Sequence, residues 1–264
     1  MTNSQLKAGI ADLQSGFLNY HMWLFLAWQD IKKRYRRSVI GPFWITISTC
    51  CVITLMGPLY GVLLNQPVGP YVQYLAVSLI IWMFISTFIN EACTTFIAAQ
   101  TYILQIKLPL ITHVLRVLSR GVFVLLHNLI IILVVLLIFP PESYSTIIFS
   151  FVGFVLVILN LFWIGLLLAI LCTRFRDIPL IVGNLVVAAF FLSPILWKVD
   201  MLGRKAFLAN FNPIYHFMEL IRAPLFGSMP TMLTYVICIS MLVIGSAITM
   251  VIFSRFRSRI AYWL

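Results

Sequence analysis

The chain has 264 residues, of which 62% are hydrophobic and only 9% are charged. A soluble domain carries roughly 25% charged residues, so this composition excludes a globular protein that covers its whole surface in water and predicts that lipid solvates much of the chain. The net charge of +11 comes from short basic clusters beside apolar runs, which is typical of the cytoplasmic loops of a membrane protein and does not favour a nucleic-acid partner.

The first predicted element is an amphipathic helix over Tyr20–Ser38. At helical spacing, its apolar face consists of Tyr20, Leu24, Trp28, Ile31 and Tyr35. The charged residues assigned to the other side of the helix are Asp30, Lys33, Arg34 and Arg37. An apolar face with tryptophan opposite a basic face is typical of a helix in the lipid headgroup region; an ordinary solvated helix is the alternative. We therefore predict a cytoplasmic N-terminus with an interfacial helix over residues 1–39 and a transmembrane domain over residues 40–264.

Six later segments are apolar and long enough to cross roughly 30 Å of hydrocarbon as helices. They are Gly41–Leu64, Tyr71–Ala98, Leu115–Phe139, Thr146–Cys172, Ile178–Trp197 and Met232–Phe253. Because every backbone polar group must be satisfied inside lipid, we predict an all-α polytopic membrane protein built from these six helices. With both termini inside, the basic residues left outside are only Lys198, Arg204, Lys205 and Arg222. This asymmetry predicts that the N-terminus and the C-terminus are both cytoplasmic.

Three connections between the predicted spans each leave two interpretations open. The outer connection Lys198–Thr231 contains a semi-apolar stretch broken by Pro213 and Pro224, which fits either half-membrane helices that re-enter from outside or a surface loop. The inner connection Gln100–His113 is either a passive turn or a short helix that presents apolar side chains to a cytoplasmic partner. Arg174–Asp177, after the fourth span, either anchors that helix end or makes ion pairs with a partner subunit.

The ionisable residues of the chain do not predict catalysis. Glu91 is expected near the cytoplasmic face, where Arg116 or Arg120 is the expected partner. The histidines and cysteines lack the spacing of metal ligands, so neither a metal nor a cofactor is predicted. The sequence contains no glycine-rich phosphate-binding loop for ATP and no nucleophile paired with a general base. We therefore predict that the chain is not an enzyme.

Aromatic side chains make up 14% of the chain, and in membrane proteins most of them serve as interfacial or packing residues. Sugar rings also stack on aromatic rings, so aromatic residues of the first and fifth spans are candidates for lining a glycan channel. These candidates are Trp44, Tyr60, Phe190, Phe191 and Trp197. Packing is the alternative for each of them.

Several stretches resemble the ABC-2 type polysaccharide-export permeases. The most specific one runs from Asp30 to Trp44 and carries the pattern Asp-x-x-x-Arg-Tyr-x-x-Ser-x-x-Gly-x-x-Trp, which in that family leads from an interfacial helix into the first span. Further similar stretches are Arg176-Asp177 after the fourth span, Asn212-Pro213 with Glu219 and Arg222 in the outer connection, and the ending Arg259–Leu264. The resemblance covers nearly the whole chain.

This resemblance implies the permease subunit of an ATP-driven exporter in a bacterial inner membrane. Two copies of the permease would form a homodimer that joins two copies of a separate ATP-binding subunit. The first and fifth spans would line a channel, and re-entrant outer helices would close it. The residues implied in receiving the ATPase stroke are Gln105, Lys107, Pro109, Arg174, Arg176 and Asp177; the last three are implied to contact either the ATPase or the interfacial helix.

The implied substrate is an O-antigen or similar polysaccharide, linked to undecaprenyl diphosphate and used in lipopolysaccharide biosynthesis. Its diphosphate is expected at the membrane surface, where guanidinium groups bind phosphate strongly. The residues expected to meet it are Arg34, Tyr35, Arg36 and Arg37. Export of capsular polysaccharide, teichoic acid or a small drug or lipid is the alternative within this class. A proton-coupled secondary carrier and a non-transporting scaffold are the alternatives from other classes, and the lack of a chain of acids at mid-membrane counts against the carrier.

Overall fold

The computed structural model describes residues 3–36, 38–41, 43–106, 108–141 and 143–264, and in these ranges the chain forms helices without any strand. Arg37 and Lys107, which the sequence analysis assigned to a diphosphate and to an ATPase, lie outside the described residues. The elements are α1 (Asn3–Leu18), α2 (Tyr20–Arg34), α3 (Phe43–Leu63), α4 (Val68–Ala98), α5 (Gln100–Gln105), α6 (Ile111–Ile138), α7 (Ile147–Arg174), α8 (Ile178–Leu192), the 3-10 segment η1 (Val199–Phe211), α9 (Pro213–Leu225), α10 (Met232–Phe256), η2 (Arg257–Arg259) and α11 (Ile260–Trp263).

Five helical segments are long and apolar enough to cross a membrane: α3, α4 with α5, α6, α7, and α10 through α11. They coincide with five of the six predicted spans. The all-helical, multi-pass architecture expected from the apolar runs is therefore present. The remaining one, the fifth predicted span, differs.

The predicted fifth span, Ile178–Trp197, is longer than the helix that the structure contains. Its helix α8 has 15 residues and ends at Leu192. At 1.5 Å per residue it reaches about 22 Å, less than the roughly 30 Å of a hydrocarbon core. Pro194 accounts for the early end, because proline donates no backbone hydrogen bond and pushes the residue before it out of the helical region.

Side chains from α4 satisfy the backbone that follows α8. The hydroxyl of Tyr71 donates to the carbonyl of Leu196 at 2.6 Å, and the hydroxyl of Tyr74 donates to the carbonyl of Pro194 at 2.7 Å. Unwound backbone inside an apolar region is tolerated where protein groups bond it. The end of α8 is thus a built feature that fixes the helix to the centre of the bundle.

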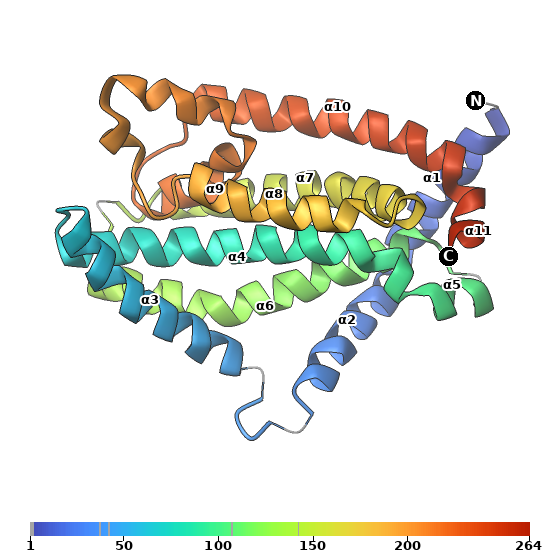
Figure 1. The fold of residues 1–264 in the computed structure, drawn as a ribbon, viewed down its shortest axis with the longest axis horizontal. Coiled ribbons are helices and arrows are strands. Elements are labelled where there is room, and N and C mark those ends of the chain that lie inside the picture. The colour runs from blue at the N-terminus through green and yellow to red at the C-terminus, as the bar shows by residue number, and fades with distance from the viewer. Residues whose placement is uncertain (1–2, 37, 42, 107, 142) are drawn as a thin grey trace.

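α4 is that centre. Helices α3, α6, α7 and α8 all pack against it, and Figure 1 shows it running along the length of the molecule. Its fully buried side chains include Tyr71, Leu75, Ala76, Ile85 and Phe88. A helix covered on several sides is apolar around most of its circumference, and α4 departs from this rule only on one face, described below.

The outer connection contains a buried helix, α9, which begins at Asn212-Pro213. The Asn212 side chain accepts a hydrogen bond from the backbone N–H of Ile214 at 2.9 Å, and Pro213 occupies the first helical position, where a missing N–H costs nothing. The helix buries Leu220 against α7, where Gly153 lies so close to the backbone of Leu220 that a side chain would not fit. The interpretation as a surface loop was therefore wrong, whereas re-entry from the outer face stays a prediction.

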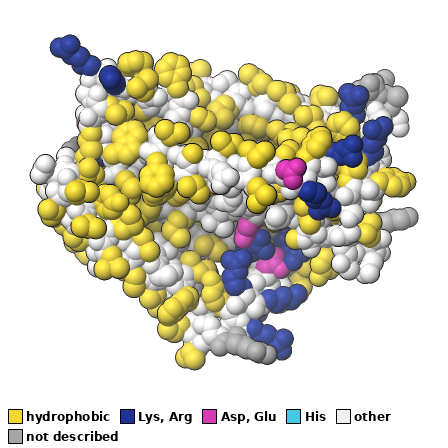
Figure 2. All heavy atoms as spheres, in the orientation of Figure 1, with side chains coloured by type: hydrophobic (Ala, Val, Ile, Leu, Met, Phe, Trp, Pro, Cys, Tyr) yellow, Lys and Arg dark blue, Asp and Glu magenta, His cyan; other side chains and the backbone are white. Residues whose placement is uncertain are grey.

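An N-terminal helix that the sequence analysis did not predict, α1, ties the two ends of the chain together. Its Asp12 is buried and accepts hydrogen bonds from Arg257 at 2.7 Å and from the backbone N–H of Ile111 at 3.3 Å. The N- and C-termini consequently lie at the same end of the molecule, together with α5 and α11 (Figure 1). Figure 2 shows lysine and arginine side chains gathered at this end and hydrophobic side chains across the middle. The side of the membrane that this end meets stays a prediction.

Candidate functional site

α2 turns two charged residues toward the bundle, contrary to the predicted arrangement. It packs against α6 with Ala27 and Ile31 buried. Asp30 and Arg34 follow Ala27 by three and seven residues, so they share this inner face. The prediction that Asp30 and Arg34 point away from the apolar face was wrong, because Ile31 of that face is buried on the same inner side as these two charged residues. Trp28 of the predicted apolar face is partly exposed and contacts the ring of Phe123 in α6.

Five charged residues of α2, α4 and α6 form one ion-pair network. Asp30 Oδ1 lies 2.5 Å from Arg116 Nη2, and Asp30 Oδ2 lies 3.1 Å from Arg120 Nη1. Glu91 Oε2 lies 2.8 Å from Arg120 Nη2. The other oxygen of Glu91, Oε1, lies 3.4 Å from Arg34 Nη2. The predicted pairing of Glu91 is confirmed with Arg120.

The network carries one positive charge in excess, since it contains three arginines and two acids. The free-energy cost of taking ion pairs out of water is offset only where the ion pairs have good geometry and further hydrogen bonds. Arg116 supplies both, because its Nε also donates to Asp30 at 2.7 Å and makes the contact bidentate. Arg34 differs from the other four, with a side chain that is 54% exposed. The network is thus a fixed core with one solvated guanidinium at its edge.

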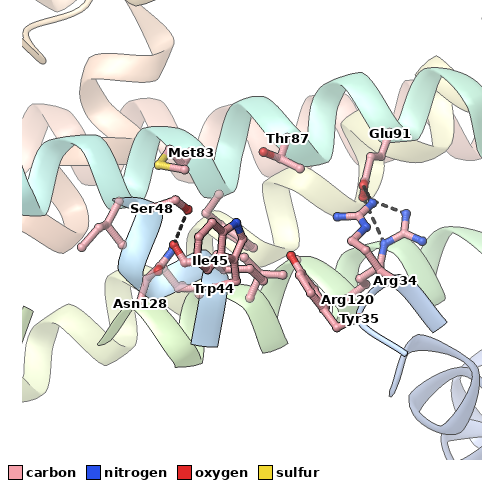
Figure 3. Close-up of a pocket in the computed structure, with 15 residues that line it drawn as sticks. Arg34, Tyr35, Trp44, Ile45, Ser48, Met83, Thr87, Glu91, Arg120 and Asn128 are labelled. Carbon is pink, nitrogen blue, oxygen red and sulfur yellow. Dashed lines mark hydrogen bonds and ion pairs between the residues drawn. The ribbon is translucent and has the colours of Figure 1, made fainter. Parts of the chain in front are cut away.

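A cavity of about 250 Å³ lies beside these ion pairs, between α2, α3, α4 and α6. Figure 3 shows Arg34, Glu91 and Arg120 at one end of it and Ser48 and Asn128 toward the other. Asn128 is only 2% exposed, and its amide oxygen has no hydrogen-bond partner among the described residues. A buried acceptor without a partner is costly, so this cavity is suited to a ligand that is anionic at one end and polar at the other.

A second cavity, of about 220 Å³, shares Glu91 and Arg120 with the first. It is lined also by Arg116 and by His113, which is buried and has both ring nitrogens without a partner in the described part of the chain. The Glu91–Arg120 ion pair therefore borders two cavities. No three His, Cys, Asp or Glu side chains among the described residues lie close enough together to hold a metal ion.

The outward face of α4 carries a row of polar side chains that the sequence analysis missed. Ser86, Asn90 and Thr94 recur every four residues, and Thr87 lies beside them, half-buried or exposed in each case. α3 borders this row through the first cavity, which Thr87 lines. α8 borders it on the other side, where a side chain at Gly183 would lie 3.8 Å from the amide oxygen of Asn90. Polar residues at helical spacing within an apolar run are the signal that could have found it.

The predicted channel-lining aromatics are not gathered in one place within a single chain. Trp44 lines the first cavity. Tyr60, toward the other end of α3, and Phe190, which packs against α4, are half-buried. Phe191 is 64% exposed and, with Trp197, lines an open cavity of about 730 Å³ between α8 and η1.

Two of the four residues assigned to a diphosphate, Arg34 and Tyr35, line the first cavity. Arg36 is exposed just beyond the end of α2, and Arg37 lies outside the described residues. The structure also adds Arg120, which the sequence analysis considered only as a partner for Glu91.

The inner connection after α4 forms a short helix, α5, and is therefore more than a passive turn. None of its six residues, all of which the structure describes, is buried. Leu104 and Ile106 are exposed, as is Gln105, while Pro109 is half-buried. An exposed apolar surface at the end of a membrane protein is typical of a contact with a partner.

The segment after α7 contacts the C-terminal helix. Arg174 lies over the ring of Trp263 at 5.5 Å, and Arg176 donates to the backbone carbonyl of Trp263 at 3.3 Å. Asp177 is exposed at the start of α8. The resemblance implied a contact with the ATPase or the interfacial helix; within the chain the contact is with α11, and a contact with an ATPase stays a prediction.

Comparison with known proteins places these features in a family. Residues 22–226 match the ABC-2 type transporter family, and this range includes the whole ion-pair network and the polar face of α4. The chain is also similar to the O-antigen export system permease protein RfbA of Myxococcus xanthus, with 23% identity over 202 residues that make up 73% of this chain and 75% of that protein. Members of this family are membrane components of transporters and are not themselves catalytic. Since the match extends over most of its length, the chain belongs to the ABC-2 type transporter family and is a membrane permease.

Proposed function

We propose that this permease moves a polysaccharide of the O-antigen type, linked to undecaprenyl diphosphate, across a bacterial inner membrane for lipopolysaccharide assembly. Two copies form the channel, and two copies of a separate ATP-binding subunit drive it. The O-antigen export named for the Myxococcus relative supports the substrate class. The family supports the need for an ATP-binding partner.

The observation that carries the proposal is the polar face of α4, formed by Ser86, Thr87, Asn90 and Thr94. Hydroxyl and amide groups on the lipid side of a spanning helix cost free energy unless they find partners. Part of that need is met within the helix, since Asn90 Nδ2 donates to the carbonyl of Ser86 at 2.9 Å. The hydroxyls of Ser86 and Thr94 likewise donate to carbonyls of their own helix, so the face offers mainly acceptor oxygens. Such oxygens match the hydroxyl groups of a neutral sugar chain and solvate it without holding it tightly.

A second copy of the chain is suited to enclose this face. The face lies between α3 and α8, and none of the 15 residues of α8, which the structure describes in full, is buried. α8 packs against α4 on one side, and a helix that is short for the bilayer and exposed on its other sides is better accommodated against protein than against lipid. A two-fold arrangement across α3 and α8 sets the two polar faces opposite each other. The proposed lining then comprises Trp44, Tyr60, Phe190, Phe191 and Trp197 as well.

The acid nearest this face supports ATP-driven transport over proton coupling. Glu91 has both carboxylate oxygens in ion pairs with arginines. A proton relay needs a chain of acids through the membrane, and the described part of α4 contains no other acid.

Reconstitution tests the proposal directly. Vesicles that contain the permease, its ATP-binding subunit and undecaprenyl-diphosphate-linked polysaccharide should expose the glycan to a glycosidase on the far side only when ATP is supplied. A hydrolysis-deficient ATP-binding subunit is the matched control. Transport driven by a proton gradient without ATP would overturn the mechanism, and ATP-driven transport of a drug or short lipid but not of the glycan would overturn the substrate.

Asn90→Phe should lower glycan transport at least several-fold in this assay, because the ring removes an amide from the polar face and narrows the space beside α8. Val243→Phe is the control, since Val243 is an exposed residue of α10 away from that face. Both variants should insert and purify equally well. Equal transport by the two would remove the α4 face from the channel.

Leu104→Glu should weaken association with the ATP-binding subunit, since a carboxylate would then lie in the exposed apolar surface of α5. Leu104 is 55% exposed, and Phe207→Glu, at a residue of η1 that is 57% exposed, is the control at the other end of the molecule. Co-purification of the two subunits measures the effect. If Phe207→Glu reduces co-purification as much as Leu104→Glu, the coupling role of α5 is wrong.

A further inference from the structure

The first cavity is built around an anion that belongs to the chain itself. The Glu91 carboxylate lies between Arg120 of α6, at 2.8 Å, and Arg34 of α2, at 3.4 Å; Figure 3 shows both guanidinium groups pointing at it. Two guanidinium groups that converge on one carboxylate also match the oxygens of a phosphate group. The same pair of arginines can therefore hold a phosphate in place of Glu91.

The charges around the cavity favour such an exchange. Arg120 is held independently by Asp30 at 3.1 Å, so it keeps its position when Glu91 leaves. Arg34 is more than half exposed, so it is accessible to a ligand from outside the bundle. The excess positive charge of the network is met by an incoming ligand that carries more negative charge than a carboxylate.

Beyond the charged end, the cavity continues with polar and aromatic side chains. Thr87 and Ser48 contribute hydroxyl groups, and Trp44 contributes a ring. The buried amide oxygen of Asn128, without a hydrogen-bond partner among the described residues, is the independent sign of a missing ligand. About 250 Å³ is far more than the roughly 10–15 Å³ that one water molecule needs.

On the basis of the proposed function, we infer that this cavity binds the phosphate-bearing headgroup of a lipid, with Arg34 and Arg120 as its ligands and Glu91 as the internal anion that the headgroup displaces. Glu91 then also makes the cavity selective for a diphosphate headgroup over the headgroups of ordinary bilayer lipids. A diphosphate diester carries twice the charge of the phosphodiester in an ordinary bilayer lipid, so it competes with the carboxylate where the bilayer lipid fails. Loss of the Arg34–Glu91 contact on binding also frees the end of α2 from α4.

The test uses the full chain in phosphatidylcholine nanodiscs that contain increasing fractions of undecaprenyl diphosphate or of phosphatidylglycerol, with bound lipid measured by native mass spectrometry. The wild-type protein should prefer undecaprenyl diphosphate. Arg34→Gln should weaken its binding roughly tenfold, as expected for one lost charge-assisted contact. Glu91→Gln should reduce the preference for undecaprenyl diphosphate over phosphatidylglycerol roughly tenfold, because phosphatidylglycerol binds more tightly once the competing carboxylate is gone. Lys33→Gln, which removes an exposed charge of α2 outside the cavity, should behave as wild type.

Glu91→Asp keeps the acid but shortens its reach to Arg34, and it should shift the preference in the same direction if Glu91→Gln does not fold. Unchanged preference in the Glu91 variants, or wild-type binding by Arg34→Gln, would overturn the inference. Competition by inorganic pyrophosphate as strong as that of the lipid would assign the cavity to a soluble anion and overturn the lipid assignment. If the Glu91 variants keep the wild-type lipid preference while the wild-type protein transports glycan, the inference fails and the proposed function stands. If the wild-type protein binds undecaprenyl diphosphate selectively but does not transport glycan, only the proposed function fails.

Discussion

Arg222→Met should destabilise the end of the bundle formed by α9 and the end of α8, and abolish export. Arg222 is 4% exposed, although from sequence it was counted only as one of the four basic residues on the outer side. It donates to the hydroxyls of Tyr74 at 2.8 Å and Ser78 at 3.0 Å, to the carbonyl of Pro194 at 2.7 Å and to the carboxylate of Glu219 at 2.6 Å. These groups belong to α4, to the segment after α8 and to α9, so one side chain joins three elements. Removal of one partner from a buried ion pair costs about 3–5 kcal/mol, because the groups left behind keep the cost of burial.

Thermal unfolding of the purified protein measures this effect. Methionine replaces the aliphatic part of the arginine side chain and is flexible, so a lower melting temperature would report chiefly the lost hydrogen bonds and charge. Arg204→Met, at an exposed residue of η1, is the matched control and should melt as wild type. Tyr74→Phe removes a single hydroxyl from the same cluster and should cost less, about 1–3 kcal/mol. A melting temperature for Arg222→Met equal to that of Arg204→Met would show that the cluster does not hold these elements together.

The spanning helices could be predicted from sequence because length and continuous apolarity decide whether a segment crosses lipid. The end of α8 could not be predicted in this way, since Pro194 and Ser193 lie within an apolar run and averaging over the run hides them. What ends the helix there is the combination of Pro194 with Tyr71 and Tyr74, more than 100 residues earlier in the chain. Only the fold brings those hydroxyl groups to the freed carbonyls.

The pairing of Glu91 was predictable because an acid near the end of a spanning helix requires a cation at the same depth. Arg120 meets that condition on the neighbouring helix. The inward turn of α2 was not predictable from its amphipathic pattern. That pattern assumes one apolar environment, whereas α2 has the bundle on one side, and the small side chain of Ala27 lets it approach α6 closely. The family-like stretch from Asp30 to Trp44 located the right segment, and the structure shows which way its charged residues point.

Asp30→Asn should release α2 from α6. The two oxygens of this one carboxylate hold Arg116 and Arg120, and all three side chains are largely buried. An amide of the same size keeps the shape but removes the negative charge, which leaves three arginines facing the single charge of Glu91. The free energy that holds α2 against α6 should fall by about 3 kcal/mol, at the lower end of the range for a broken buried ion pair because the site is partly solvated.

Amide hydrogen exchange over residues 20–34 should rise in Asp30→Asn while exchange in α4 and α7 stays as in wild type, because the change opens a local unit and not the whole bundle. Asp200→Asn, the same substitution at an exposed acid of η1, separates this effect from a general change in net charge. Unchanged exchange in α2 would mean that Ala27 and Ile31 hold the helix without the ion pairs. Faster exchange in α4 as well would instead show that the network supports the centre of the bundle, since Glu91 and Arg120 connect α4 to the same acid. Asp30 also keeps Arg120 in place beside the cavity. Asp30→Asn should therefore lose the preference for a diphosphate headgroup together with the protection of α2 from exchange. If only one of these two properties is lost, the docking of α2 and the binding of the headgroup are independent.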